Sequence, residues 1–222
     1  MKILIFGATG MVGQGVLREC LAASDVSQVT VVGRTDVAQE HPKLKQLIQP
    51  NLMNLEPVEN RLHGFDACFF CLGISSSGMS EDAYRYITYD VTLAIAKVLA
   101  RLTPAMIFTY VSGAGTDGTE RGGSMWARVK GKTENDLMKL SFAGVYLFRP
   151  AVIQPLHGIK SKTASYQLFY SITKPFLSIA RRLFPSFVVT TEEMGQAMLN
   201  AARRGSGRVI LESKDIAQMA RG

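Results

Sequence analysis

The chain has 222 residues, of which 47% are hydrophobic and 19% charged. This length suits one domain with a sizeable core, and the composition excludes a disordered or fibrous protein. No apolar run reaches the roughly 18 residues of a membrane span, and the first residues lack the layout of a secretion signal. We therefore expect a single cytoplasmic domain, residues 1–222. The net charge is +7, but basic residues are spread along the chain, so we expect no nucleic-acid partner.

Short apolar runs of strand length alternate with helical patterns along most of the chain. Strands are predicted at residues 3–6, 29–32, 67–71, 106–111 and 145–148. Helices are predicted at residues 11–23, 81–102 and 125–140. Weaker patterns predict a further strand at 46–51 and a short helix at 58–62. This alternation is typical of an α/β fold in which a doubly wound parallel sheet is covered by helices on both faces.

The pattern changes after Pro150. Residues 163–187 are rich in aromatic side chains and are interrupted by Pro175 and Pro185, which predicts a broken helical excursion within residues 154–190. We expect it to form a lid or another substrate-side element. A subunit contact and, less favoured, a contact with a membrane surface are the alternatives. The sequence leaves the oligomeric state open.

The final part of the chain returns to regular structure. A helix is predicted over residues 190–203, with Thr190 or Thr191 as its N-cap and two glutamates in its first turn. A strand at 208–213 and a terminal helix follow it.

The chain has three cysteines, Cys20, Cys68 and Cys71. This odd number predicts free thiols in a reducing compartment. Cys68 and Cys71 form a C-x-x-C motif, but they lie in a strand-like apolar run, where residues three apart point to opposite faces. We therefore expect buried cysteines and no metal site.

The first predicted strand runs directly into "GATGMVG", which places Gly7, Gly10 and Gly13 at the opening of the first helix. Glycines in this position let the backbone turn sharply and approach a pyrophosphate, whose charge is met by the N–H groups at the start of the helix. The strand, turn and helix together predict a dinucleotide-binding site.

The end of the second predicted strand indicates which dinucleotide is bound. An acidic residue there would bind the 2′-hydroxyl of NAD, whereas Arg34 can pair with the 2′-phosphate of NADP. NADP is therefore the favoured cofactor. Asp36, two residues later, keeps NAD as the alternative.

Five segments, in this order and spacing, resemble the atypical and extended short-chain dehydrogenase/reductase superfamily. They are "GATGMVG", "CLGISSS", "YVSGAG", "VKGKTE" and "FRPAVI". The similarity covers essentially the whole chain and points to the compact members that are NmrA-like or similar to NAD-dependent epimerases and dehydratases. It implies a Rossmann fold with a small C-terminal helical excursion.

The resemblance also implies roles for individual residues. From the pyrophosphate and adenosine to the nicotinamide, the implied cofactor contacts are Gly7, Thr9, Gly10, Met11, Val12, Gly13, Arg34, Asn51, Leu52, Cys71, Leu72, Gly73, Lys130 and the backbone after Pro150. Lys130 would bind the nicotinamide ribose. Ser112 matches the serine that ends the fifth strand and would help to polarise a substrate oxygen.

The chain departs from the family at the catalytic pair, Tyr-x-x-x-Lys, because Trp126 stands four residues before Lys130. An indole N–H can orient a carbonyl group but has no proton to transfer. Tyr166, Tyr170 and His157 are alternative proton donors. Two functions follow. The first is an NADP(H) oxidoreductase that acts on a small-molecule substrate with an altered proton donor, with Trp126 and Ser112 beside Lys130. The second is a non-catalytic NADP(H) sensor or scaffold that responds to a small-molecule effector.

Overall fold

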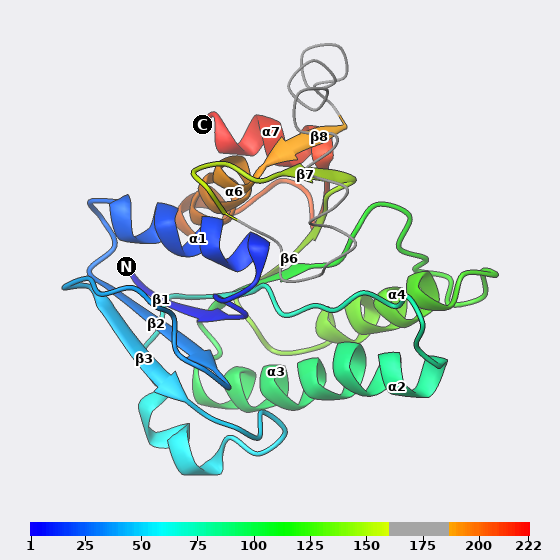
Figure 1. Cartoon of the computed structure of the whole chain (residues 1–222), viewed down its shortest axis with the longest axis horizontal. Coiled ribbons are helices and arrows are strands. Elements are labelled where there is room, and N and C mark those ends of the chain that lie inside the picture. The colour runs from blue at the N-terminus through cyan, green and yellow to red at the C-terminus, as the bar shows by residue number, and fades with distance from the viewer. Residues whose placement is uncertain (160–186) are drawn as a thin grey trace.

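A computed structural model describes residues 1–159 and 187–222 of the chain (Figure 1). The excursion was predicted within residues 154–190, of which residues 160–186, including Tyr166 and Tyr170, lie outside the described residues.

The described residues form a parallel sheet of seven strands. In spatial order the strands are β3 (Leu44–Ile48), β2 (Gln28–Gly33), β1 (Lys2–Phe6), β4 (Ala67–Phe70), β5 (Ile107–Val111), β6 (Gly144–Arg149) and β9 (Ile210–Glu212). The order runs outward in both directions from the neighbours β1 and β4. This arrangement confirms the predicted doubly wound α/β fold, in which ligands bind at the carboxyl ends of the strands next to the reversal point.

Helices cover both faces of this sheet (Figure 1). One face carries α1 (Met11–Ala22), α6 (Thr191–Arg204) and α7 (Ser213–Ala220). The other face carries α2 (Glu81–Arg85), α3 (Val91–Leu102) and α4 (Met125–Leu137). A short 3-10 helix, η1 (Glu56–Arg61), stands where the weak helical pattern was predicted.

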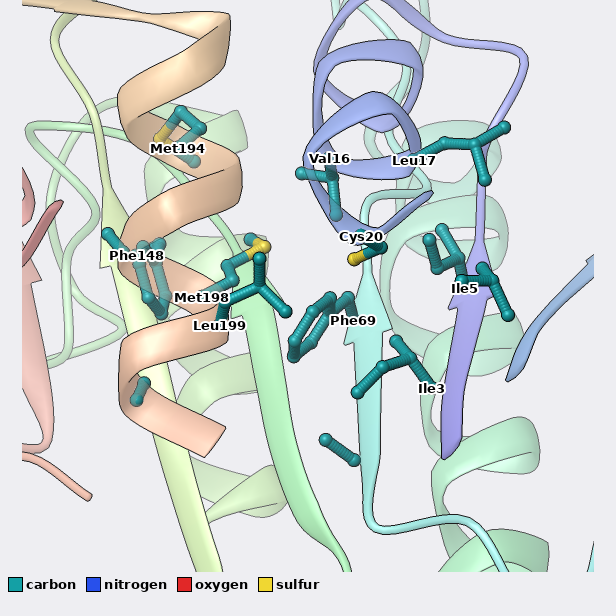
Figure 2. Close-up of a cluster of buried hydrophobic side chains, with 14 of the residues drawn as sticks. Ile3, Ile5, Val16, Leu17, Cys20, Phe69, Phe148, Met194, Met198 and Leu199 are labelled. Atoms are coloured by element: carbon teal, nitrogen blue, oxygen red, sulfur yellow. The ribbon is translucent and has the colours of Figure 1, made fainter. Parts of the chain in front are cut away.

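Two buried clusters lie on opposite faces of the sheet because successive residues of a strand point in opposite directions. Ile3 and Ile5 belong to the cluster under α1 and α6, whereas Leu4 and Phe6 belong to the other cluster. Figure 2 shows the first cluster, with Phe69 of β4 between side chains of α1 and α6.

The cysteines are free, and the two of the C-x-x-C motif contact different cores. Cys68 lies in the cluster of Leu4, and Cys71 packs against the cluster of Ile3. Burial raises the pKa of the Cys71 thiol to about 12. The predicted placement on opposite faces is confirmed, with Cys68 buried and Cys71 only half-buried.

Three details differ from the predicted elements. The helix expected over residues 81–102 is interrupted by a π-helical turn, η2 (Tyr86–Asp90), between α2 and α3. The strand expected at 46–51 is found at Leu44–Ile48. A separate parallel pair, β7 (Val152–Gln154) with β8 (Val188–Thr190), was not predicted, because three residues are too few to show a periodic pattern.

A capping box starts α6. The Thr190 hydroxyl accepts the N–H of Glu193 at 3.0 Å, and the Glu193 carboxylate accepts the N–H of Thr190 at 2.9 Å. Both contacts satisfy backbone N–H groups at the helix start that would otherwise lack partners. Of the two N-cap candidates, the structure selects Thr190.

Glycines bring α1 and α6 into close contact. A Cβ atom added to Gly15 would lie 2.6 Å from Cβ of Thr191 and 2.7 Å from its carbonyl oxygen. One added to Gly195 would lie 2.7 Å from Cγ of Glu19. Real Cβ atoms do not approach so closely, so the spacing of the two helices depends on these glycines.

We predict that Gly15→Ala destabilises the protein. Alanine gains about 1 kcal/mol in helix propensity, but overpacking costs about 1–3 kcal/mol, and here the contacted atoms include main chain that cannot rotate away. Because the main chain cannot move aside, we expect the upper end of this cost, about 3 kcal/mol, and so a net loss of about 2 kcal/mol, which should lower Tm by roughly 4–8 °C in calorimetry. Gly207→Ala is the control, because no atom lies within 4 Å of the added Cβ. A Tm for Gly15→Ala equal to the wild-type value would contradict this account of the helix contact.

Candidate cofactor-binding site

The turn between β1 and α1 is built from close backbone contacts. Gly7 has φ +84°, a left-handed conformation that favours glycine. It directly follows β1, which pairs with β4. A Cβ added to Gly7 would lie 2.7 Å from the Cys71 carbonyl group. A Cβ added to Gly13 would lie 2.1 Å from the Gly7 carbonyl oxygen. Two of the three predicted glycines are therefore required by the fold itself.

Gly10 occupies a different position in this turn. It is the N-cap of α1 and provides no side chain for a capping hydrogen bond, while its own N–H donates to the Gly7 oxygen at 3.0 Å. A Cβ on Gly10 would contact only that oxygen, at 3.3 Å. The helix start is therefore open on this side, and its N–H groups and positive dipole end favour an anion.

The other predicted adenosine contacts lie at the carboxyl ends of neighbouring strands. Arg34 follows β2 and is exposed. Asn51 is exposed, and its side-chain oxygen accepts the N–H of Met53 at 3.0 Å. Leu52 is buried in the second core, so its side chain serves packing.

The predicted ribose loop begins where β4 ends. The N–H of Cys71 donates to the Phe6 oxygen at 2.9 Å, which keeps the loop against β1. Leu72 is half-buried, and Gly73 is exposed with no atom within 4 Å of an added Cβ. The structure thus brings the ends of β1, β2 and β4 to one edge, as the fold requires.

Lys130 is held at the same edge by the end of β5. Its ammonium donates to the carbonyl oxygens of Ser112 at 2.9 Å and Val111 at 3.4 Å. The side chain is half-buried, and desolvation lowers the pKa of Lys130 to about 8 against an opposing effect of the nearby Glu134 carboxylate. An ammonium with this pKa remains mostly charged at neutral pH.

The Ser112 hydroxyl is hydrogen-bonded inside the protein. It donates to the buried carboxylate of Glu134 and also lies 3.3 Å from the Phe148 carbonyl oxygen. A serine hydroxyl has one proton to donate. Polarising a substrate oxygen, the role predicted for Ser112, would require this hydrogen bond to break, and that role stays a prediction.

Glu134 and Arg149 were not singled out as site residues from the sequence. Their side chains form a buried ion pair: Nε of Arg149 lies 3.0 and 3.2 Å from the two Glu134 oxygens. The spacing of Glu134, four residues after Lys130 on one helix face, was the available signal. The partner on β6 comes from a distant part of the chain and could not be identified from spacing.

Trp126 occupies the expected tyrosine position on the first turn of α4. Its half-buried indole ring faces Gly115, where an added Cβ would lie 3.6 Å from Cη2 of the ring. Gly115 has φ +84° and belongs to the loop between β5 and α4. The indole therefore packs against the main chain of this loop.

The loop around Trp126 is organised by Asp117. Its carboxylate accepts the Thr119 hydroxyl at 2.6 Å and the N–H groups of Gly122 at 2.7 Å and Thr119 at 2.9 Å. These hydrogen bonds lower the pKa of Asp117 to about 2. The main chain of Asp117 also packs on α4, because a Cβ on Gly131 would lie 1.8 Å from the Asp117 oxygen.

Two further predicted positions are placed by the structure. The Pro150 carbonyl accepts the N–H of Ala114 at 3.0 Å, so the backbone after β6 is tied to the loop that carries Gly115. His157, one of the alternative proton donors, is exposed, and its Nε2 lies 3.0 Å from the Glu192 carboxylate of α6.

Comparison with protein families and curated proteins gives distant relatives. No family model matches the chain. Protein HTATIP2 of Rattus norvegicus is 26% identical over 99% of this chain and 89% of its own length. Protein FMP52-2, mitochondrial, of Scheffersomyces stipitis is 29% identical over 89% of this chain and 85% of its own length. Protein FMP52, mitochondrial, of Saccharomyces cerevisiae is 27% identical over 97% of this chain and 95% of its own length.

These relatives correct the expected location. The prediction of a cytoplasmic protein is wrong, because the fungal FMP52 relatives are named as mitochondrial proteins. Composition separates membrane spans from globular domains but does not distinguish one aqueous compartment from another. Within residues 1–159 and 187–222, no helix is long and apolar enough to cross a membrane.

Solved structures share the fold at low sequence identity. The Bordetella bronchiseptica enzyme WbmF in complex with NAD+ superposes with a TM-score of 0.68 at 15% identity, covering 99% of this chain and 76% of that one. UDP-glucuronic acid 4-epimerase from Bacillus cereus, in complex with UDP-glucuronic acid and NAD, gives a TM-score of 0.67 at 14% identity, covering 96% of this chain and 77% of that one. Relatives and fold together confirm that the chain resembles the atypical short-chain dehydrogenase/reductase superfamily and has the Rossmann fold of the NAD-dependent epimerase/dehydratase-like proteins.

Proposed function

We propose that this protein binds a nicotinamide dinucleotide, NADP(H) in preference to NAD(H), and acts as an oxidoreductase on a small carbonyl or alcohol substrate. The observation that carries the proposal is the open cradle at the start of α1. Gly7 and Gly13 shape it by backbone contacts that exclude a side chain, while Gly10 leaves it accessible. Lys130 presents an ammonium group at the same edge of the sheet.

The residues of this edge fit the parts of a dinucleotide. The N–H groups at the start of α1 would bind the pyrophosphate, and Lys130 would bind the nicotinamide ribose. When bound, the dinucleotide supplies hydride transfer. The chain supplies binding and orientation, and Trp126 can donate a hydrogen bond to a substrate oxygen.

Arg34 supports the preference for NADP(H). It is exposed at the end of β2, where a guanidinium can form a charge-assisted pair with a 2′-phosphate. Asp36 is also exposed and provides the alternative contact with the ribose of NAD. The solved structures named above contain NAD+ or NAD, so the choice of NADP(H) rests on Arg34 alone.

A second function, a non-catalytic NADP(H) sensor or scaffold, is favoured by the state of the two residues beside Lys130. Trp126 has no proton to transfer, and the Ser112 hydroxyl is donated to Glu134. Both functions share the cofactor site. They differ in whether NADPH is consumed in the presence of a carbonyl substrate.

Gly10→Val tests the position of the cofactor. The added side chain would fill the open side of the cradle, so calorimetry should show no NADPH binding, while far-UV circular dichroism stays near wild type because only the Gly7 oxygen lies near the new Cβ. Gly207→Val, with no atom within 4 Å of its Cβ, should bind normally. Unchanged NADPH affinity of Gly10→Val would place the cofactor elsewhere.

Arg34→Ala tests the choice of cofactor. A charge-assisted pair with the 2′-phosphate contributes about 1.5–3 kcal/mol, which corresponds to a roughly 10–150-fold preference for NADPH over NADH in the wild type. The variant should lose most of this preference, and Arg61→Ala, at an exposed arginine of η1, should keep it. Equal affinities of the wild-type protein for both cofactors would refute the assignment.

Trp126→Tyr tests whether the altered donor limits turnover. The phenol would stand one helical turn from Lys130, and general acid catalysis typically contributes about 10²–10⁴-fold. NADPH oxidation with aldehydes, ketones and quinones should therefore rise in this variant but not in Trp126→Phe. Strong wild-type activity that survives in Trp126→Phe would show that the proton comes from another group.

A further inference from the structure

A buried carboxylate lies next to the candidate site. Glu134 is only 1% exposed and stands on the inner face of α4. A buried charge is costly unless it is paired and hydrogen-bonded. Glu134 meets this condition through two side chains from other elements, Ser112 at the end of β5 and Arg149 at the end of β6.

Ser112 links this carboxylate to Lys130. The Ser112 hydroxyl donates to Glu134, and the carbonyl oxygen of the same residue accepts the Lys130 ammonium at 2.9 Å. Glu134 and Lys130 are also one helical turn apart on α4. The position of the ammonium therefore depends on a residue whose side chain is fixed by Glu134.

The groups around Lys130 include one negative charge that raises its pKa, the Glu134 carboxylate on α4. On β5, the centre of the Tyr110 ring lies 5.7 Å from the ammonium. On β6, Arg149 is paired with Glu134 and lies 3.8 Å from the half-exposed Glu212. Burial lowers the pKa of Lys130, and the Glu134 charge opposes this effect.

We propose that Glu134 is a positioning residue of the cofactor site: it fixes Ser112, whose carbonyl group holds the Lys130 ammonium, and it places a negative charge one helical turn from that ammonium. This inference rests on the proposed dinucleotide binding. It assigns to Glu134 and Arg149 a role beyond joining α4 to the sheet.

The first measurement follows the charge of Lys130 without any cofactor. In the wild type, the side-chain NMR signals of Lys130 should titrate with a midpoint of about 8. Glu134→Gln removes the charge that favours the ammonium, so the midpoint should fall by about one pH unit. Glu134→Asp retains the charge and should keep a midpoint near wild type.

The second measurement follows NADPH affinity against pH by fluorescence. Protonated Lys130 favours binding, so affinity should be highest at low pH and fall as the pH rises through the Lys130 midpoint. In Glu134→Gln this fall should begin about one pH unit lower, which gives about 2-fold weaker binding at pH 7 and about 5-fold weaker binding at pH 8. Asp136→Asn is the matched control, because Asp136 lies on the same helix but pairs with Lys132 and Lys139.

Loss of folding is separated from loss of positioning by a charge-neutral variant. Glu134→Gln removes the buried partner of Arg149 and leaves only the half-exposed Glu212 near its guanidinium, which should destabilise the fold. Glu134→Gln with Arg149→Gln removes both charges, and the Lys130 midpoint should still fall. An unchanged midpoint in folded samples of both variants would overturn the inference. A wild-type protein that binds no NADPH would overturn the proposed function, and the Lys130 titration would still decide whether Glu134 controls the ammonium.

Discussion

The candidate site depends on the close approach of main chain at the turn after β1. Gly13 lies over the Gly7 oxygen, and Gly7 lies against the carbonyl group of Cys71, at distances where no Cβ fits. These contacts bring the start of α1 to the carboxyl ends of β1 and β4, where the N-cap, Gly10, provides no capping side chain. The result is a helix start at the sheet edge, and the N–H groups of a helix start suit a pyrophosphate.

A second group of contacts fixes the other half of the site. Lys130 binds two carbonyl oxygens at the end of β5, and Glu134 joins the same strand to Arg149 on β6. The pairing is buried, so its net contribution to the free energy of unfolding is modest, because desolvation of both charges offsets their attraction. Its effect is geometric: α4 is held in one register against β5 and β6.

Much of this arrangement could be predicted from sequence because it depends on local patterns. The glycines after the first strand, the alternation of strands and helices, and the opposite faces of Cys68 and Cys71 follow from short-range rules. The β7–β8 pair and the Glu134–Arg149 pair could not be predicted, because each joins segments whose contact is set by the tertiary fold. The π-helical turn at Tyr86–Asp90 also escaped prediction, since its residues continue a helical pattern. The cellular location was predicted wrongly because amino-acid composition does not identify the compartment of a protein.

The anchoring of Lys130 explains why the proposed cofactor site does not require a tyrosine at residue 126. Both hydrogen bonds of the Lys130 ammonium go to main-chain oxygens, so its position does not depend on the side chain one turn earlier. Trp126 is accommodated separately, against Gly115 in a loop organised by Asp117. Cofactor binding and proton transfer are therefore physically separable on the first two turns of α4. Under the proposed function, a change from phenol to indole alters the chemistry offered to a substrate and leaves in place the nucleotide contacts proposed at the start of α1 and at Lys130.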